Sequence, residues 1–301
     1  MSAALVATGL SKRYRRHWGL RECTLEIPQG RVAALVGPNG AGKTTLLHLA
    51  TGLLRPTSGV VSVLGRTPDD PEVLHEIGFV AQDAPLYRSF SVRDLLEFGR
   101  RTNARWDVDL ATDRIERLGL DPGQRAGTLS GGQRAQVALT LALAKRPRVL
   151  LLDEPLASLD PLARREFLQS LMESVADSDL SVVLSSHLIT DLERVCDYLV
   201  VLSSARTQVA GVIDDLLATH RVLVGPGRDV ERIAGVAEIV RTSRTERQTT
   251  ILARVDGPIA DPSWSADPVD LEELVLAYLG APDASALPPP SLARARAEVS
   301  R

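Results

Sequence analysis

The fold of this chain is decided by residues 32 to 47, VAALVGPNGAGKTTLL, where an apolar run leads into a glycine-rich loop. Val32 to Val36 is predicted to form a buried strand, and Thr45 to Leu47 to continue into a helix. The loop has the spacing G-x-x-x-x-G-K-S/T and consists of Gly37, Pro38, Asn39, Gly40, Ala41, Gly42, Lys43 and Thr44. Its glycines let backbone N–H groups surround a polyphosphate, and the helix points its positive end at the same anion. The stretch therefore predicts a nucleotide site.

Two side chains of this loop are assigned to the chemistry of a bound nucleotide. Lys43 is expected to reach the outer phosphates, and the hydroxyl of Thr44 to ligate Mg²⁺. The alternative is a glycine-rich turn that only joins a core strand to a helix. Strand, spacing, Lys and Thr all agree with the nucleotide interpretation, which we adopt.

The composition limits the classes of protein to which this chain can belong. The 301 residues are 44% hydrophobic and 24% charged, which is ordinary for a globular chain with one large and one small domain. A formal charge of -3 argues against a generally basic nucleic-acid surface. Cys23 and Cys196 lie far apart without a C-x-x-C partner, so neither a disulfide framework nor a zinc site is indicated. No apolar stretch approaches the ~20 residues that span a bilayer, and the N-terminus lacks a signal pattern, so a cytosolic protein is expected.

A pair of carboxylates follows the most apolar run of the chain. Residues 149 to 154 read VLLLDE, which is typical of a central parallel strand with polar residues at its carboxyl edge. Burying acidic groups at that position costs free energy, so they are expected there only if a metal or a reaction uses them. Asp153 suits the surroundings of a Mg²⁺ ion, and Glu154 can orient and deprotonate a water. The alternative is a solvated strand end.

Four further positions admit two interpretations from the residues alone. LSGGQ, residues 129 to 133, precedes a largely apolar helix, so Ser130 is either a helix cap or part of a second anion site. His187 follows the apolar strand Leu180 to Ser186; a lone histidine is commonly structural, but ligand groups collect at that edge of a parallel sheet. Tyr14 either stacks on a base or packs at a strand end. Gln82, at the end of a short strand, either reaches a metal-bound water or is an ordinary surface residue.

The remaining segments suggest an insertion and a second domain. Residues 91 to 119 have a helical pattern that is interrupted around Trp106. After residue 220 the pattern changes to strands near 236–240 and 249–255 and a helix at 271–279. The proline run at 288–290 and the Ala/Arg-rich end indicate a disordered tail.

In order, these motifs resemble the full set of the ABC-type ATPase subunits over residues 3 to 220. LSGGQ together with Asp-Glu-Pro after a strand is very specific, whereas the glycine loop alone fits many nucleotide-binding proteins. The resemblance implies an α/β fold, a P-loop NTPase with an ABC-type ATPase core at 3–220 and a helical subdomain at about 86–147. A small C-terminal α+β domain, similar to the extension common in bacterial ABC exporter ATPases, is expected at 221–285, and a disordered tail at 286–301. No core motif departs from the family pattern.

The same resemblance assigns roles around ATP and Mg²⁺. ATP lies between two subunits, so the LSGGQ signature of one chain contacts the γ-phosphate held by the phosphate loop of its partner. Lys43 and the loop through Thr45 hold the phosphates, Tyr14 stacks on adenine, and Gln82 senses Mg²⁺ beside Thr44 and Asp153. Glu154 acts on the water, and His187 holds the γ-phosphate. The resemblance further implies which residues act across the dimer. The ATP held by the partner chain is contacted by Ser130, Gly131, Gly132 and Gln133, and communication between the subunits involves Asp160.

The function implied is an ATP-hydrolysing subunit of an ABC transporter. It forms a homodimer or heterodimer of ATPase subunits, drives a separate multi-span membrane permease, is directed to export, and binds no nucleic acid. Its expected location is cytoplasmic, on the inner face of the cell membrane through the permease. The alternative is a soluble ABC-type ATPase of translation or DNA repair; the single phosphate loop and the short insertion disfavour both. Apolar residues after Gln82 are expected either to dock the permease or to pack the insertion: Leu86, Tyr87, Phe90 and Trp106.

Overall fold

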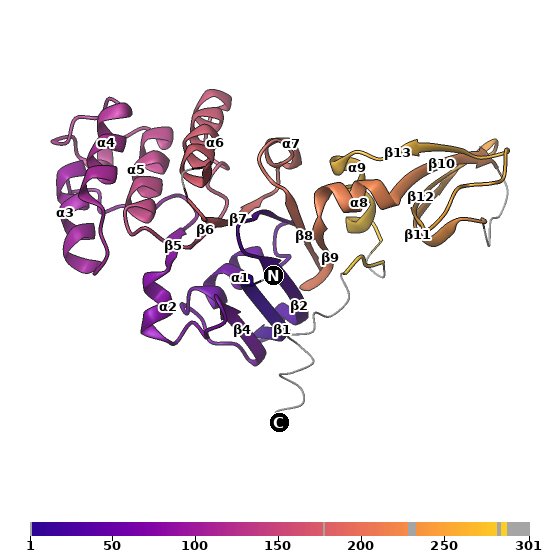
Figure 1. Ribbon diagram of the computed structural model, residues 1–301, viewed down its shortest axis with the longest axis horizontal. Helices are drawn as coiled ribbons and strands as arrows, with labels where there is room; N and C mark the ends of the chain where they lie inside the picture. The colour runs from indigo at the N-terminus through magenta and orange to yellow at the C-terminus, as the bar shows by residue number, and fades with distance from the viewer. Residues whose placement is uncertain (1, 177, 228–232, 282–283, 288–301) are drawn as a thin grey trace. The chain divides into compact units, whose positions relative to one another are not determined.

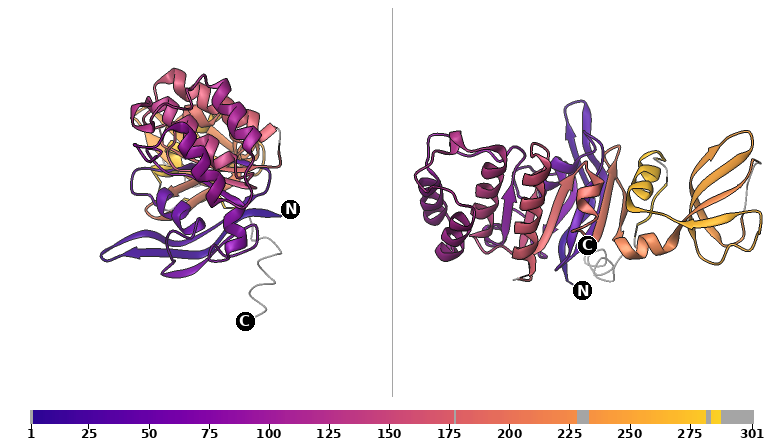
Figure 2. Two further views of the ribbon diagram at one scale, coloured as in Figure 1. Left: turned by 90° about the vertical axis from the view of Figure 1, so that its left-hand side faces the viewer. Right: turned by 90° about the horizontal axis from the view of Figure 1, so that it is seen from above.

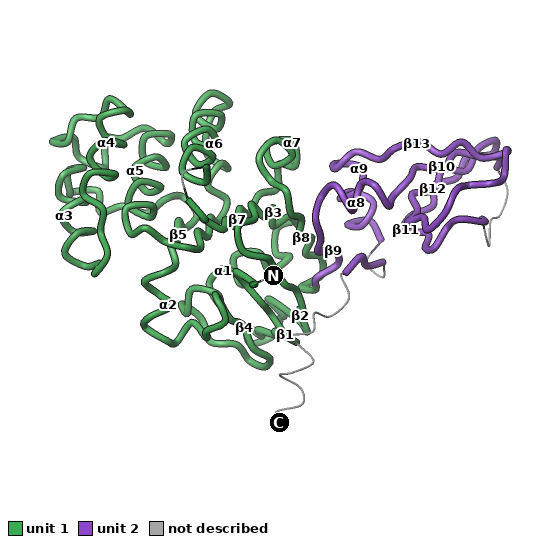
Figure 3. Tube along the Cα trace, viewed as in Figure 1, with its two compact units in different colours: residues 1–206 green, residues 207–301 purple. Residues whose placement is uncertain are grey.

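The computed structural model describes residues 2–176, 178–227, 233–281 and 284–287, which form two compact units at 1–206 and 207–301 (Figure 3). The sequence places the domain boundary further along, at residue 220. None of the described helices has the length and apolar character needed to cross a bilayer.

Unit 1 is built on a parallel sheet whose strands are β3 (Val32–Val36), β5 (Ile77–Val80), β6 (Val149–Leu152), β7 (Ser181–Ser186) and β8 (Tyr198–Ser203) (Figure 1). Their order is β5-β6-β7-β3-β8, and neighbouring strands in this order are parallel. Every residue of β3, β6, β7 and β8 is buried. Continuous apolar strands of this kind are typical of parallel sheets covered on both faces. The predicted α/β class is confirmed, and the loops after β3, β5, β6 and β7 leave the same edge.

A second, antiparallel sheet with the order β2-β1-β4 forms a layer of its own (Figure 2). Its strands are β1 (Ala3–Tyr14), β2 (His17–Pro28) and β4 (Ser58–Val63). Helix α1 (Lys43–Ala50) contacts β2 and β4. Register shifts let the pairing of β1 with β2 continue to the Tyr14–His17 turn.

The predicted helical insertion is present as α3 (Val92–Thr102) and α4 (Val108–Arg117), joined to α5 (Gly131–Leu143) through η1 (Ala126–Thr128). Ser91 and Asp94 form a capping box at α3, and Asp107 caps α4. A compact apolar core joins the three helices: Val92, Leu95, Ile115, Leu120, Ala126, Leu129 and Val137. Helices α2 (Pro71–His75), α6 (Pro161–Ala176) and α7 (Ile189–Leu192) complete the unit.

Unit 2 begins within β9 (Arg206–Val212). It also contains α8 (Ile213–Thr219), β10 (His220–Pro226), β11 (Val236–Arg244), β12 (Gln248–Val255), β13 (Ser265–Pro268) and α9 (Leu271–Leu279). The antiparallel sheet has the order β11-β12-β10-β13. The predicted strands near 236–240 and 249–255 and the helix at 271–279 are all present. Strand β13 escaped sequence reasoning because its four residues are all exposed and show no apolar alternation.

Two polar groups in unit 2 are buried against each other. The ring of His220 lies 2.7 Å from the Leu216 carbonyl through Nδ1 and 2.8 Å from the Tyr278 hydroxyl through Nε2. Burial lowers the pKa of His220 and raises that of Tyr278 to about 12. Ala286, expected in the disordered tail, is instead buried and exchanges backbone hydrogen bonds with Gln208 and Ala210. The rest of the predicted tail, from residue 288, lies outside the described residues.

Candidate functional site

The loop after β3 has a backbone that only glycine adopts easily. Gly40 and Gly42 have φ values of 81° and 108°, in the left-handed region. A Cβ on Gly42 would lie 2.3 Å from the Gly19 carbonyl oxygen, and one on Gly37 2.3 Å from that of Leu202. The sequence pattern of the loop therefore reflects both its conformation and its close contacts with neighbouring backbone. Lys43 is the first residue of α1, so the N-terminus of that helix faces the loop.

A cavity of about 430 Å³ opens beside this loop, within the ~300–1,000 Å³ range of small-molecule sites. It brings together residues from five separate parts of the sequence. Its lining comprises Tyr14, His17, Trp18, Gly19, the loop Asn39 to Thr45, Gln82, Glu154, Ala157 and His187. The predicted assembly of phosphate loop, glutamine, glutamate and histidine at one edge of the sheet is thus present in one cavity.

Glu154 is the residue on which the charged contacts converge. Its Oε1 lies 3.1 Å from Lys43 Nζ, and its Oε2 lies 2.7 Å from His187 Nδ1. Lys43 also donates to the Gly37 carbonyl at 2.8 Å. Lys43 and Glu154 are both buried, while His187 is half exposed. Burying charged groups is tolerated when they are paired, so the lysine and the glutamate depend on each other here.

Asp153 lies just behind this group and is almost fully buried. Its Oδ1 accepts a hydrogen bond of 2.9 Å from the Ser185 hydroxyl, and the same hydroxyl oxygen accepts the Glu154 N–H at 2.8 Å. Ser185 was not identified from the sequence. Its signal, a serine between the apolar run Val182 to Leu184 and Ser186, becomes meaningful only once β6 and β7 are known to be neighbours.

The oxygen groups at this edge fit Mg²⁺. Among the described residues, no three His, Cys, Asp or Glu side chains cluster in a way that could hold a metal by themselves. Asp153 supplies one carboxylate, Thr44 an exposed hydroxyl and Gln82 an exposed amide. Mg²⁺ is commonly held by one or two carboxylates together with substrate phosphates and waters, rather than by a cage of protein ligands.

The Tyr14 end of the cavity is more aromatic than the sequence suggested. Tyr14 stacks on His17 with ring centroids 5.4 Å apart, and its hydroxyl lies 3.5 Å from Thr45 Oγ1. His17 and Trp18, which also line the cavity, were missed by sequence reasoning. The antiparallel pairing of Tyr14 with His17 across the turn brings them there.

The signature LSGGQ forms the N-terminus of α5 and lies outside the cavity lining. Ser130 and Gln133 form a capping box, with Gln133 N donating to Ser130 Oγ at 3.2 Å and Ser130 N to Gln133 Oε1 at 3.0 Å. The helix-cap interpretation of Ser130 is therefore confirmed. Gly132 packs closely on α6, because a Cβ there would lie 2.9 Å from that of Ala163. Asp160 caps the start of α6 by accepting the N–H groups of Leu162 and Ala163, and it too is absent from the cavity lining.

Comparisons with known proteins identify the family. The family model described as ABC transporter matches residues 20–157. The uncharacterized ABC transporter ATP-binding protein YxlF of Bacillus subtilis (strain 168) is 33% identical over 212 residues, which cover 69% of this chain and 70% of that protein. The ABC transporter ATP-binding protein YtrB of the same organism is 28% identical over 284 residues, or 90% of this chain and 96% of that protein.

An importer is also among the relatives: the molybdenum import ATP-binding protein ModC of Rhodobacter capsulatus is 38% identical over 200 residues, or 64% of this chain and 55% of that protein. A solved ATP-binding subunit of an ABC transporter matches with a TM-score of 0.64 and 26% identity, covering 71% of this chain and 92% of that one. The phosphate loop, the signature helix and the paired carboxylates thus occur in a cassette of known type. The chain belongs to the family of ATP-binding, ATP-hydrolysing subunits of ABC transporters.

Proposed function

We propose that this chain dimerises around ATP and uses its hydrolysis to drive a separate membrane permease in the export direction. One observation carries the proposal. The cavity of a single chain joins the phosphate loop to Glu154 and His187 but leaves Ser130 to Gln133 outside its lining. A second chain would supply that exposed helix N-terminus to the γ-phosphate.

The residues of the cavity divide the work of phosphoryl transfer. The loop N–H groups and Lys43 hold the phosphates, so charge that develops on the transferring group meets donors already in place. Bound Mg²⁺, held through Thr44, Asp153 and Gln82, would neutralise charge on the phosphate oxygens. Glu154 takes the proton of the attacking water, and His187, which contacts Glu154, holds the γ-phosphate. When the γ-phosphate leaves, the contact that joins the two chains is lost and the dimer reopens.

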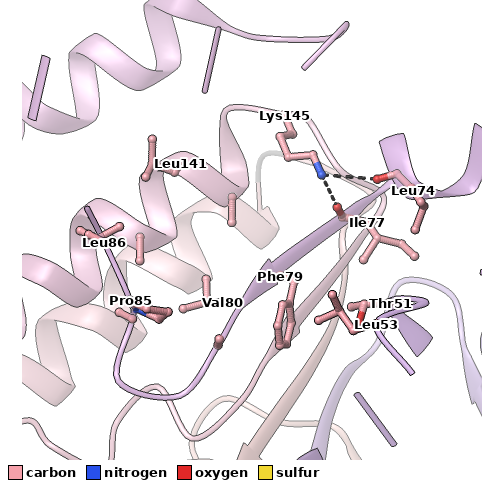
Figure 4. Close-up of a pocket in the computed structure, with 14 residues that line it drawn as sticks. Thr51, Leu53, Leu74, Ile77, Phe79, Val80, Pro85, Leu86, Leu141 and Lys145 are labelled. Carbon is pink, nitrogen blue, oxygen red and sulfur yellow. Dashed lines mark hydrogen bonds between the residues drawn. The ribbon is translucent and has the colours of Figure 1, made fainter. Parts of the chain in front are cut away.

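An apolar groove of about 440 Å³ next to Gln82 is proposed as the permease contact (Figure 4). Leu53, Leu74, Phe79, Pro85 and Leu86 lie along it, and Leu53 and Leu74 are 62% and 39% exposed. Lys145 closes one end by donating to the carbonyls of Leu74 and Ile77 (Figure 4). Exposed apolar surface of this kind marks interaction sites. Ala81, directly before Gln82, also lines the groove, so the backbone would link an occupant of the groove to the nucleotide site.

The four residues first considered for docking separate into two groups. Trp106 packs onto α3, since a Cβ on Gly99 would lie 2.3 Å from its ring. Phe90 and Leu86 pack against the core of the helical insertion, and Leu86 also lines the groove. Tyr87 is 60% exposed and contacts Phe90 and Phe98, with centroids 5.1 and 5.7 Å away. The docking interpretation is therefore kept for Tyr87 and Leu86 and given up for Trp106 and Phe90.

Export is proposed from the resemblance of the C-terminal extension to those of bacterial exporter ATPases. The similarity to YtrB runs through most of this extension as well as the cassette. Transport in inverted membrane vesicles that contain the permease would test the direction: accumulation of substrate inside such vesicles supports export, and its absence with accumulation in right-side-out vesicles refutes it.

Complementation tests the shared site. Lys43→Ala disables the phosphate loop, and Ser130→Arg blocks the signature helix. If the two motifs act between chains, mixing the two inactive variants restores one intact site per heterodimer and part of the ATPase rate. A matched control mixes Lys43→Ala with the double variant Lys43→Ala/Ser130→Arg, in which every phosphate loop is disabled and no activity returns. Recovery in the control, or none in the test mixture although heterodimers form, would contradict the proposal.

A further inference from the structure

We propose that Ser185 is a positioning residue for ATP hydrolysis, whose single hydroxyl orients both the Asp153 carboxylate and the backbone of Glu154. The inference rests on the proposed roles of those two acidic residues. Ser185 itself is not among the residues that line the cavity. It would act only through its two neighbours.

The sheet places Ser185 beside the carboxylates. Leu184 pairs with Leu152, the last residue of β6, so Ser185 is one step beyond that pair and next to Asp153. On its other side Ser185 pairs with Leu35 of β3, the strand that enters the phosphate loop. The residue is fully buried, and its Oγ makes both hydrogen bonds, to Asp153 Oδ1 at 2.9 Å and from Glu154 N at 2.8 Å.

The backbone at Glu154 explains why a side-chain partner is needed. Asp153 still follows the strand pattern, because its N–H donates to the Val80 carbonyl at 2.9 Å. Glu154 has φ of 48°, in the left-handed region that residues other than glycine rarely adopt. This turn points its side chain toward Lys43 and His187. Its N–H is buried and takes the Ser185 hydroxyl as acceptor, as a buried N–H group requires.

The two hydrogen bonds therefore have a joint consequence. The proton of the Ser185 hydroxyl is directed to Asp153, while its oxygen is directed to the Glu154 N–H. The hydroxyl thus sets the orientation of the proposed metal ligand and supports the turn that carries the proposed base. Partners of this kind, which hold a ligand from behind, change metal affinity or activity about 10–100-fold when they are replaced.

The neighbouring Ser186 has a different structural role. Ser186 accepts the Leu188 N–H at 3.0 Å and so shapes the turn that carries His187. Ser181, at the other end of β7, provides a matched control for Ser185. It is equally buried, and its hydroxyl oxygen accepts the Gly30 N–H at 2.9 Å, but it touches neither carboxylate. Both serines satisfy a backbone N–H, and only Ser185 also holds an acidic side chain.

The experiment compares Ser185→Ala, Ser185→Thr and Ser181→Ala in the full chain. Affinity for Mn²⁺ in the ADP complex, measured by electron paramagnetic resonance, reports on Asp153 independently of turnover. Nucleotide affinity in EDTA reports on the phosphate loop, and thermal unfolding in EDTA reports on folding. For Ser185→Ala we expect Mn²⁺ affinity and kcat to fall about 10–100-fold with little change of nucleotide affinity in EDTA. Ser185→Thr keeps the hydroxyl and should recover both, and Ser181→Ala should leave both unchanged.

The outcomes separate the inference from a structural role and from failure of the proposed function. If Ser185→Ala and Ser181→Ala lower the melting temperature alike while Mn²⁺ affinity and kcat stay at the parental values, Ser185 is only structural and the inference is wrong. Ser185→Cys, of similar size and with a weak thiol donor, replaces Ser185→Ala if that variant does not fold, with the same expectations. Asp153→Asn tests the metal role itself. Weaker Mn²⁺ binding in Asp153→Asn but not in Ser185→Ala refutes the positioning role alone, whereas no effect in either refutes both.

Discussion

Replacing Glu154 with Gln changes the charge of one buried group and keeps its shape. The parent carboxylate lies 3.1 Å from Lys43 Nζ and 2.7 Å from His187 Nδ1, and is 9% exposed. An amide can still accept a hydrogen bond from Lys43, but it cannot take the proton of a water. The variant should therefore show two separate effects, one on turnover and one on stability.

The expected loss of turnover follows from the role of a general base. Such a group contributes about 10²–10⁴-fold to the rate. At about 1.36 kcal/mol per factor of ten, this is about 2.7–5.4 kcal/mol of lost transition-state stabilisation. Binding of ATP should persist, because the phosphate loop and Lys43 are unchanged. The ATP-bound form should then accumulate as a dimer that hydrolysis no longer opens.

The stability effect should depend on nucleotide. Without ATP, Lys43 keeps only a neutral partner in place of its buried carboxylate. His187 is 49% exposed, so solvent screens its half of the contact, and only the lysine half is counted. Removing a charged partner while an amide acceptor remains should cost about 1–3 kcal/mol. For a domain of this size that is about 2–4 °C of melting temperature per kcal/mol. Triphosphate supplies Lys43 with a new anion, so the deficit should disappear when ATP is bound.

Differential scanning fluorimetry with EDTA alone and with ATP, beside a steady-state ATPase assay, measures both effects. Glu193→Gln, which changes an exposed carboxylate, serves as the control and should match the parent in every condition. Parental ATPase activity in Glu154→Gln would refute the role of the base. A melting temperature equal to the parental value without nucleotide would show that the Lys43–Glu154 pair contributes nothing to folding.

Two further predictions concern the groove and unit 2. Leu53→Asp should leave thermal unfolding and basal ATPase activity unchanged but reduce co-sedimentation with membranes that contain the permease. The control Leu276→Asp, which places a charge at an exposed site of unit 2, should co-sediment like the parent. Equal co-sedimentation of the two variants would reject docking in the groove. Because burial lowers the pKa of His220 below its ordinary value near 6.5, the unfolded chain takes up the proton first on acidification, so the stability of unit 2 should be complete above about pH 6.5 and decrease as the pH falls toward the lowered pKa. Thermal unfolding of the parent and of His220→Gln between pH 7.5 and 5.5 checks this, and an identical pH dependence of the two would contradict it.

Local patterns in the sequence determined the elements and most of the nucleotide cavity. The run before Gly37, the positive φ positions at Gly40 and Gly42, and the strand ending at Asp153 and Glu154 all have signals within a few residues. Helix α9 was predicted with both of its ends, because an N-cap aspartate, apolar spacing and a following glycine coincide there. The parallel sheet then carries these loops to one edge, so the constellation of Lys43, Gln82, Glu154 and His187 could be expected in advance.

Only the tertiary structure decided which residues far apart in the chain come into contact. Ser185 has no local feature that marks it, and its importance comes from the pairing of β7 with β6, 32 residues from Asp153. From the sequence, Trp106 could belong to an exposed apolar surface, but in the structure its ring packs against Gly99. The sequence alone admits two roles for Ser130, and the capping box establishes one of them without excluding a contact with a partner chain. Periodicity and turn chemistry act over a few residues, whereas hydrogen bonds, ion pairs and cavities depend on which segments the fold brings side by side.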